Sequence, residues 1–218
     1  MTSSGHAGSE NSPTTDDAAA RRRELLGLCA AKTAGLDGAK AQRYSRYVSD
    51  ALNISPRPQA SGTARSVEKG IHLEYLRQLG PWLLVPVLCV VVALSTPNFW
   101  IQSLLIAVLL LTFAVPIRLV QVWSWRDKLN AVGAAMLPEA GVSIRVDAKS
   151  LTVGAMSAPW GDVRLEALEG QWLWRPRIFP KFRIDQLRLA TGKESLVLDA
   201  RLIENGQEVV DTICDKLV

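Results

Sequence analysis

The sequence predicts an α+β membrane protein, in which a two-helix transmembrane hairpin is followed by a small antiparallel β-sandwich or barrel that a C-terminal helix closes. Two observations predict this fold class. No charged residue lies between Arg77 and Arg118, and an uncharged stretch of this length can cross a bilayer twice. After Pro138, short segments alternate apolar and polar residues, as half-buried strands do.

The chain before the hairpin divides into four segments. Residues 1–20 are small, polar and without apolar periodicity, so we expect a disordered tail. Residues 21–52 fit two basic amphipathic helices, which lie on the cytoplasmic leaflet, dock on a partner or pack against the protein's own β domain. Residues 53–66 are rich in Pro, Ser and Gly and predict a linker. Residues 67–79 are expected to form a juxtamembrane helix.

Residues 80–118 form the predicted transmembrane hairpin. Its spans cover residues 81–96 and 99–117, and only Pro97 and Asn98 remain to reverse the chain. The alternative is a buried hairpin in a soluble protein, which so long an uncharged run disfavours. Lysine and arginine flank the hairpin on both sides, whereas its turn has no charge. The positive-inside rule therefore predicts an integral, two-span protein with both termini in the cytoplasm, as in the bacterial inner membrane.

Tryptophan gathers near the ends of the predicted spans, where an amphipathic indole prefers the headgroup region. We expect four of these side chains to act as membrane-interface anchors: Trp82, Trp100, Trp123 and Trp125. A second juxtamembrane helix is expected over residues 119–138, because Pro138 stops the helical pattern.

Residues 140–218 are expected to form a cytoplasmic β domain. The hairpin GVSIRVDAKSLTV, Trp160 within APWGDV and a closing helix after ENGQ resemble the bacterial pleckstrin-homology-like domains that follow a transmembrane hairpin, including the YcxB-like group. The resemblance implies a β-sandwich or barrel capped by a helix, and a binding role at the membrane face. It implies no specific ligand.

One segment of this domain combines cations with aromatic rings. Its candidate lipid- or partner-binding residues are Trp172, Trp174, Arg175, Arg177, Phe179, Lys181, Phe182 and Arg183. Such a segment suits an anionic surface, near which each cation contributes about 1 kcal/mol. In the alternative interpretation, Trp172 and Trp174 fill the core of the β domain and the cations are solvated. Single-stranded nucleic acid is a third interpretation, disfavoured because no nucleic-acid-binding motif occurs in the sequence.

The remaining composition argues against catalysis. The two histidines, His6 and His72, lie outside the predicted β domain, the three cysteines have no metal-ligand spacing, and no catalytic or nucleotide-binding motif occurs. We therefore expect no enzyme, no cofactor and no metal. The net charge of +4 is explained by basic flanks that face anionic lipid, so we expect no nucleic-acid partner.

The sequence thus predicts a membrane-anchored, non-enzymatic scaffolding protein. Its expected partners are the lipid bilayer and a protein, which is either a different chain or a second copy of this one. The alternative function is the sensing of anionic lipid headgroups by the basic and aromatic segment at residues 172–183.

Overall fold

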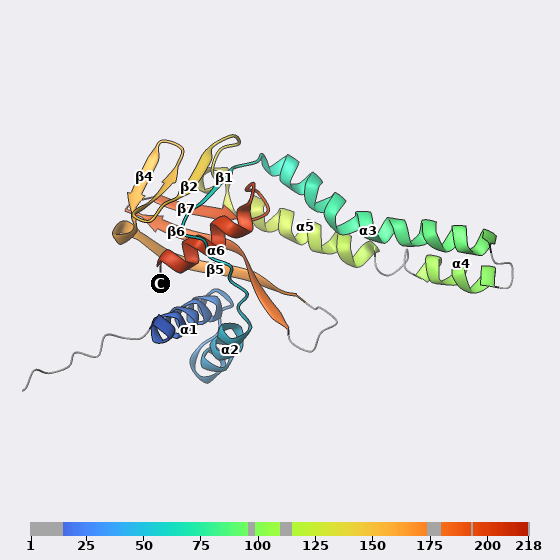
Figure 1. Cartoon of the computed structure of the whole chain (residues 1–218), viewed down its shortest axis with the longest axis horizontal. Helices are drawn as coiled ribbons and strands as arrows, with labels where there is room; N and C mark the ends of the chain where they lie inside the picture. The colour runs from blue at the N-terminus through green and yellow to red at the C-terminus, as the bar shows by residue number, and fades with distance from the viewer. Residues whose placement is uncertain (1–14, 96–98, 110–114, 174–179, 193, 218) are drawn as a thin grey trace, which may run out of the picture.

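The computed structural model describes residues 15–95, 99–109, 115–173, 180–192 and 194–217 (Figure 1). Its α-helices are α1 (Thr15–Thr33), α2 (Gly38–Ala51), α3 (Val67–Ser95), α4 (Trp100–Leu109), α5 (Val115–Val132) and α6 (Gly206–Leu217). Its strands are β1 (Ala60–Thr63), β2 (Ser143–Val146), β3 (Ser150–Val153), β4 (Met156–Pro159), β5 (Val163–Leu173), β6 (Lys181–Thr191) and β7 (Glu194–Asp199). Short 3-10 helices cover Ala134–Met136 and Trp160–Asp162.

The strands form two antiparallel sheets, one in the order β1-β2-β3-β4 and one in the order β5-β6-β7. Ile144 and Val146 of β2 are buried while Ser143 and Arg145 are exposed, because successive side chains of a strand point to opposite faces. The same alternation buries Leu151 and Val153 of β3. The protein is therefore an α+β protein in which each sheet turns an apolar face to a shared core.

Helix α6 closes this core by packing against β1, β2 and β6. Val209, Val210, Ile213 and Cys214 recur on one face of the helix, and each is fully buried. Burial of one such aliphatic side chain contributes about 1.5–3 kcal/mol to folding. The apolar stripe that the sequence shows after Asn205 therefore faces the sheets, and it holds the C-terminus in the domain.

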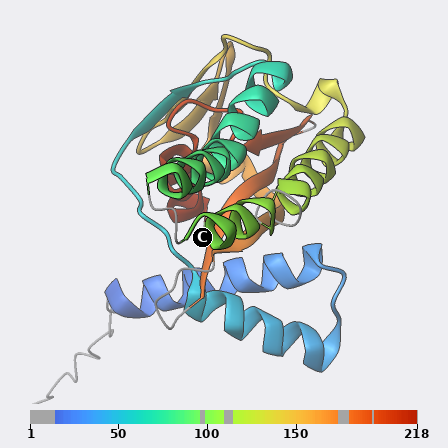
Figure 2. The same ribbon diagram turned by 90° about the vertical axis from the view of Figure 1, so that its right-hand side faces the viewer.

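Helices α1 and α2 pack on the same domain, on the side of β5 and β6 (Figure 2). Leu26 of α1 and Val48 of α2 are buried in the core of the sheets, and Arg22 Nη1 lies 2.7 Å from Asp215 Oδ1 of α6. Of the three placements considered for these helices, the structure shows packing against the protein's own β domain. Residues 15–20, expected in the disordered tail, belong to α1, and residues 1–14 lie outside the described residues.

Strand β1 lies within the predicted linker at residues 53–66. It pairs with β2 from Ala60↔Val146 to Thr63↔Ser143. The composition is typical of a linker, but small side chains are required here: a Cβ on Gly62 would collide with the backbone carbonyl of Glu204. The β domain therefore begins before the apolar helices, which leave the domain after β1 and return to it before β2.

The predicted transmembrane hairpin at residues 80–118 is wrong, and the two-span membrane localisation is corrected with it. Within the described residues, no helix has the length and apolar character needed to cross a bilayer. The apolar part of α3, residues 80–95, is about 24 Å long at 1.5 Å per residue. Helix α4 has 10 residues, which is about 15 Å, against a hydrocarbon core of about 30 Å. The expected second span instead divides between α4 and the start of α5, with residues 110–114 outside the described residues.

The two apolar helical segments still form a distinct unit, which we call the apolar arm: residues 80–95 of α3 and residues 99–109 with α4. The segments contact each other and project away from both sheets (Figure 1). At the base of the arm, α5 packs against α3, and Val122, Trp125 and Leu129 of α5 form a second small core with Leu202. This core attaches the arm to the turn between β7 and α6.

Candidate binding site at the base of the apolar arm

Three carboxylates are buried where α3, β6 and β7 meet. Asp199 is 1% exposed, Asp185 5% and Glu74 7%. A buried carboxylate lowers stability unless charged or hydrogen-bonding groups compensate it, so the partners of these residues define the local architecture. The cluster lies at the base of the apolar arm, between the arm and the β domain.

Asp199 has the most complete set of partners. Arg201 donates to it from Nε at 2.9 Å and from Nη2 at 2.7 Å, and the backbone N–H of Arg201 adds a third hydrogen bond. Trp125 Nε1 of α5 donates to Oδ2 at 2.9 Å. The guanidinium carbon of Arg201 also lies 4.2 Å from the centre of the Trp125 ring, which is cation–π geometry. Arg201 is therefore fixed in position by both residues.

Asp185 of β6 is held by Arg183, two residues away on the same strand. Arg183 Nε donates to Asp185 Oδ1 at 2.9 Å, and the Arg183 side chain is only 16% exposed. Burial raises the pKa of Asp185, although the charges of Arg183 and Arg201 oppose the rise. Glu74 of α3 accepts a hydrogen bond from Gln78 Nε2 at 2.6 Å.

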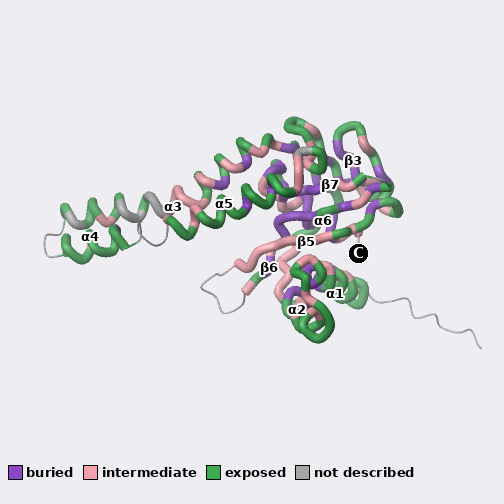
Figure 3. The backbone as a smooth tube through the Cα atoms, turned by 180° about the vertical axis from the view of Figure 1, so that it is seen from behind, coloured by how far each residue is buried: buried purple, intermediate pink, exposed green. Residues whose placement is uncertain are grey.

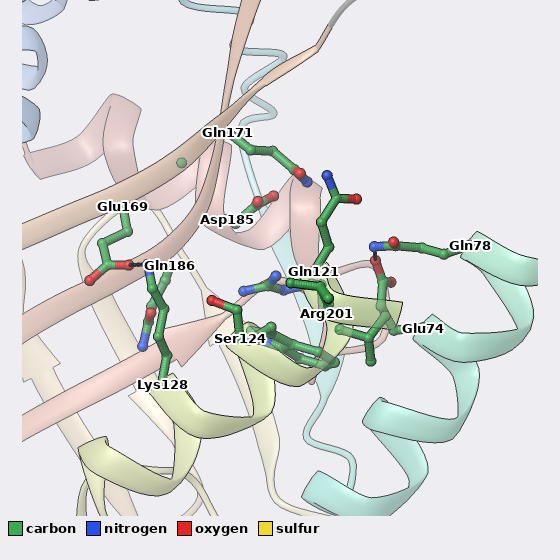
Figure 4. Close-up of a pocket in the computed structure, with 14 residues that line it drawn as sticks. Glu74, Gln78, Gln121, Ser124, Lys128, Glu169, Gln171, Asp185, Gln186 and Arg201 are labelled. Carbon is green, nitrogen blue, oxygen red and sulfur yellow. Dashed lines mark hydrogen bonds and ion pairs between the residues drawn. The ribbon is translucent and has the colours of Figure 1, made fainter. Parts of the chain in front are cut away.

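Two open cavities flank this cluster and share Glu74, Asp185 and Arg201 in their walls. The first cavity, of about 350 Å³, lies between α3, α5 and the strands β5 and β6. Polar side chains line it together with Arg201, among them Gln121 and Ser124 of α5 (Figure 4). Gln78 also lines it, and its buried Oε1 has no hydrogen-bond partner among the described residues.

The second cavity has a volume of about 400 Å³ and lies at the start of α6. Its walls carry four arginines: Arg65, Arg77, Arg183 and Arg201. Carboxylates also face it, and these are Glu74, Asp185 and Glu208. The first cavity is thus rich in amides, whereas the second is rich in guanidinium groups. Such groups bind carboxylates and phosphates through paired hydrogen bonds.

The structure divides the predicted basic and aromatic segment. Trp174, Arg175, Arg177 and Phe179 lie outside the described residues. Phe182 is 2% exposed, and the half-buried ring of Trp172 lies 5.0 Å from it and 4.6 Å from Tyr47 of α2, as measured between ring centres. Both rings therefore pack between β5, β6 and α2.

The two described cations of this segment have different surroundings. Lys181 is exposed and donates to Asn53 Oδ1 at 3.1 Å. Arg183 points inward to Asp185 and lines the second cavity. The described part of the segment therefore contributes one residue, Arg183, to the candidate site.

The four predicted anchor tryptophans are also separated. Trp100 in α4 is 51% exposed and Trp123 in α5 is 53% exposed, whereas Trp125 is 4% exposed and donates to Asp199. Trp125 therefore packs inside the protein instead of at its surface. The side chain of Trp82 lies outside the described part of the chain.

Sequence reasoning missed Glu74, Asp185, Asp199 and Arg201. Spacing gives a weak signal for them: Glu74 and Gln78 are four residues apart on one helix, and Asp199 and Arg201 flank a tight turn. No local pattern, however, indicates that these residues meet. In the described ranges, no group of three or more His, Cys, Asp and Glu side chains is arranged to hold a metal ion. No protein family, curated protein or solved structure matches this chain.

Proposed function

We propose that this protein is a binding and scaffolding protein that attaches to the surface of a lipid bilayer. Its apolar arm enters the hydrocarbon, and its β domain is held at the headgroups, where it assembles with a protein partner. One observation carries the proposal: most of the described residues of the arm are exposed (Figure 3), and the large side chains among them are apolar. Surfaces of this kind mark contact with lipid or with another protein.

Lipid is favoured because the exposure is not confined to one stripe. Val90, Val91 and Val92 are consecutive in α3, and they are 44%, 52% and 42% exposed. Consecutive residues are about 100° apart around a helix, so three exposed neighbours span more than half of its circumference. In α4, the consecutive residues 104–106 are exposed in the same way, while Ala107 is buried. A protein partner covers one face of a helix, whereas lipid surrounds all of it.

The distribution of charge also favours lipid as the surroundings of the arm. The arm has no charged residue. The segments that flank it in the sequence carry more basic than acidic residues: Arg65, Lys69, Arg77, Arg118, Arg126 and Lys128 against Glu68, Glu74 and Asp127. Each cation near an anionic membrane surface contributes about 1 kcal/mol to the free energy of membrane binding. An apolar arm with cationic flanks therefore matches one leaflet, in which the hydrocarbon lies next to the anionic headgroups.

The scaffolding part of the proposal rests on the domain architecture. Antiparallel sheets of four and three strands, closed by α6, fit the pleckstrin-homology-like expectation, in which the domain binds partners at the membrane face. Helices α1 and α2 add exposed surface to this domain, including Leu25, Leu28 and Tyr47. We infer that the protein partner contacts the β domain, because the arm is occupied by lipid.

Flotation of the full chain with neutral phosphatidylcholine vesicles tests the attachment. Leu104 and Leu105 of α4 are 48% and 61% exposed, so Leu104→Glu with Leu105→Glu leaves the packing of the domain intact. Each charge placed in hydrocarbon costs about 2.5–3.5 kcal/mol, so this variant is expected to stay with the unbound protein. The matched control is Leu25→Glu with Leu28→Glu in α1, whose side chains are 47% and 44% exposed. Equal flotation of both variants would refute the attachment.

A further inference from the structure

We propose that the arginine-lined second cavity binds the phosphate of an anionic lipid headgroup at the base of the apolar arm. This inference rests on the proposed attachment to a bilayer, and it adds the class of ligand and the residues that hold it. The site differs from the predicted segment at residues 172–183, with which it shares only Arg183.

Two of the four arginines are available for a ligand. Arg65 and Arg77 line the cavity, and neither side chain forms an ion pair or a hydrogen bond with any residue that the structure describes. Arg65 follows β1 and Arg77 lies on α3, so the two guanidinium groups reach the cavity from different elements. Both residues can therefore contribute donors to an anion that enters this cavity.

The other two arginines are already held in position. Arg183 is bound to Asp185 and Arg201 to Asp199, and both side chains are 16% exposed. Holding a donor in place before the ligand arrives reduces the entropy that binding loses. Arg183 and Arg201 therefore provide a rigid wall with N–H groups that their carboxylates leave free, since a guanidinium has five donors.

The carboxylates that face the cavity do not cancel the free arginines. Glu208 Oε1 lies 2.6 Å from Arg57 Nη2, and Glu74 is hydrogen-bonded to Gln78. Asp185 is paired with Arg183. Gln78 is neutral, so its hydrogen bond leaves the negative charge of Glu74 in place. Arg65 and Arg77 together outweigh that charge by one, and the positive excess suits an anion.

The position of the cavity selects a lipid as the source of the phosphate. Arg77 is the last charged residue before the arm, and Gly80 follows it by three residues, which is about 4.5 Å along α3. When the arm lies in hydrocarbon, the Arg77 edge of the cavity is therefore next to the headgroups, and the cavity extends from there toward the start of α3. Its volume of about 400 Å³ admits a phosphate ester.

The test measures binding of the full chain to phosphatidylcholine vesicles with and without phosphatidic acid. Arg65→Gln with Arg77→Gln is compared with Arg145→Gln with Arg188→Gln, which removes the same charge from exposed strand positions outside the cavity. We expect the cavity pair to weaken binding to phosphatidic acid vesicles at least about tenfold and the control pair less than about twofold. Binding of both variants to neutral vesicles is expected to stay unchanged.

Three results would overturn parts of this account separately. Equal losses in the two variants, or no loss in the cavity pair, would overturn the cavity site. Binding of soluble glycerol phosphate as tight as binding to vesicles, measured by calorimetry and abolished in the cavity pair, would overturn the assignment to lipid. Failure of the unaltered chain to bind neutral vesicles would overturn the proposed attachment, whatever the cavity binds.

Discussion

At the scale of single residues, the contact between α5 and β7 depends on one indole hydrogen bond. Trp125 Nε1 donates to Oδ2 of Asp199, whose side chain is fully buried, so its removal leaves this oxygen with the Arg201 Nη2 hydrogen bond as its remaining described partner. We expect Trp125→Phe to lower the free energy of unfolding by about 1.5–3 kcal/mol. Urea unfolding of the full chain in mild detergent measures the change.

The control for that change lies two residues away on the same helix. Trp123 is 53% exposed, so Trp123→Phe is expected to change the free energy of unfolding by less than about 0.5 kcal/mol. Similar losses in the two variants would show that the indole hydrogen bond does not stabilise the base of the arm.

Asp211 predicts a pH dependence of stability. Its carboxylate accepts hydrogen bonds from Ser55 N at 3.0 Å and Gln207 Nε2 at 2.7 Å, yet burial raises its pKa above the ordinary value of 3.8. The folded state therefore holds a proton that the unfolded state has released, and stability falls as the pH rises from 3.8 through the raised pKa.

The variant Asp211→Asn isolates this effect, because an amide does not titrate. Relative to this variant, the unaltered protein is expected to become less stable between pH 4 and pH 7. Urea unfolding at several pH values measures the difference. A difference that is constant, or that grows in favour of the unaltered protein as the pH rises, would contradict the assignment.

Residue patterns could predict the aromatic side of the β domain but not its charged cluster. Trp172 lies next to Phe182 because both belong to one strand pair, and the sequence already places them in one segment. Asp199 meets Trp125 across 74 positions of sequence, and Arg201 covers the same ring. No spacing rule connects residues that only the packing of α5 on the β domain brings together.

At the scale of elements, periodicity predicted those helices and strands that have one apolar face. The closing helix and the alternating strands β2 and β3 belong to this class, because burial of one face determines their pattern. Strand β1 escaped detection because its residues, ASGT, are small and its partner β2 lies far away in the sequence. The hairpin prediction failed for another reason. It treated residues 80–118 as two continuous apolar spans, whereas in the structure α3 ends, α4 lies and α5 begins within that range.

A test of β1 as a strand of the sheet uses Gly62. Because its missing Cβ leaves room for the carbonyl of Glu204, Gly62→Ala is expected to lower the free energy of unfolding by about 1–3 kcal/mol. The neighbouring Ser61 is exposed, so Ser61→Ala serves as the control and is expected to change stability by less than about 0.5 kcal/mol. Equal stability of the two variants would argue against the close packing of β1 on the turn before α6, which holds β1 in the domain.

At the scale of the whole molecule, the chain combines a domain that buries its apolar residues with an arm that exposes them. Val209 and Ile213 are fully buried in the domain, whereas Leu94 of the arm is 82% exposed. The two parts meet at a charged base, where Asp199 and Arg201 join the arm to the sheets. We interpret this division as attachment of the arm to lipid and presentation of the domain to a partner.

Quenching of a tryptophan by lipids brominated on their acyl chains tests this division most directly. The variant Leu105→Trp places an indole in the middle of α4, and Leu25→Trp places one on the exposed surface of α1. In vesicles, the account predicts that acyl-chain bromine quenches the emission added by Leu105→Trp and leaves the emission added by Leu25→Trp unchanged. Equal quenching of the two added emissions, or none for Leu105→Trp, would contradict the placement of the arm in hydrocarbon.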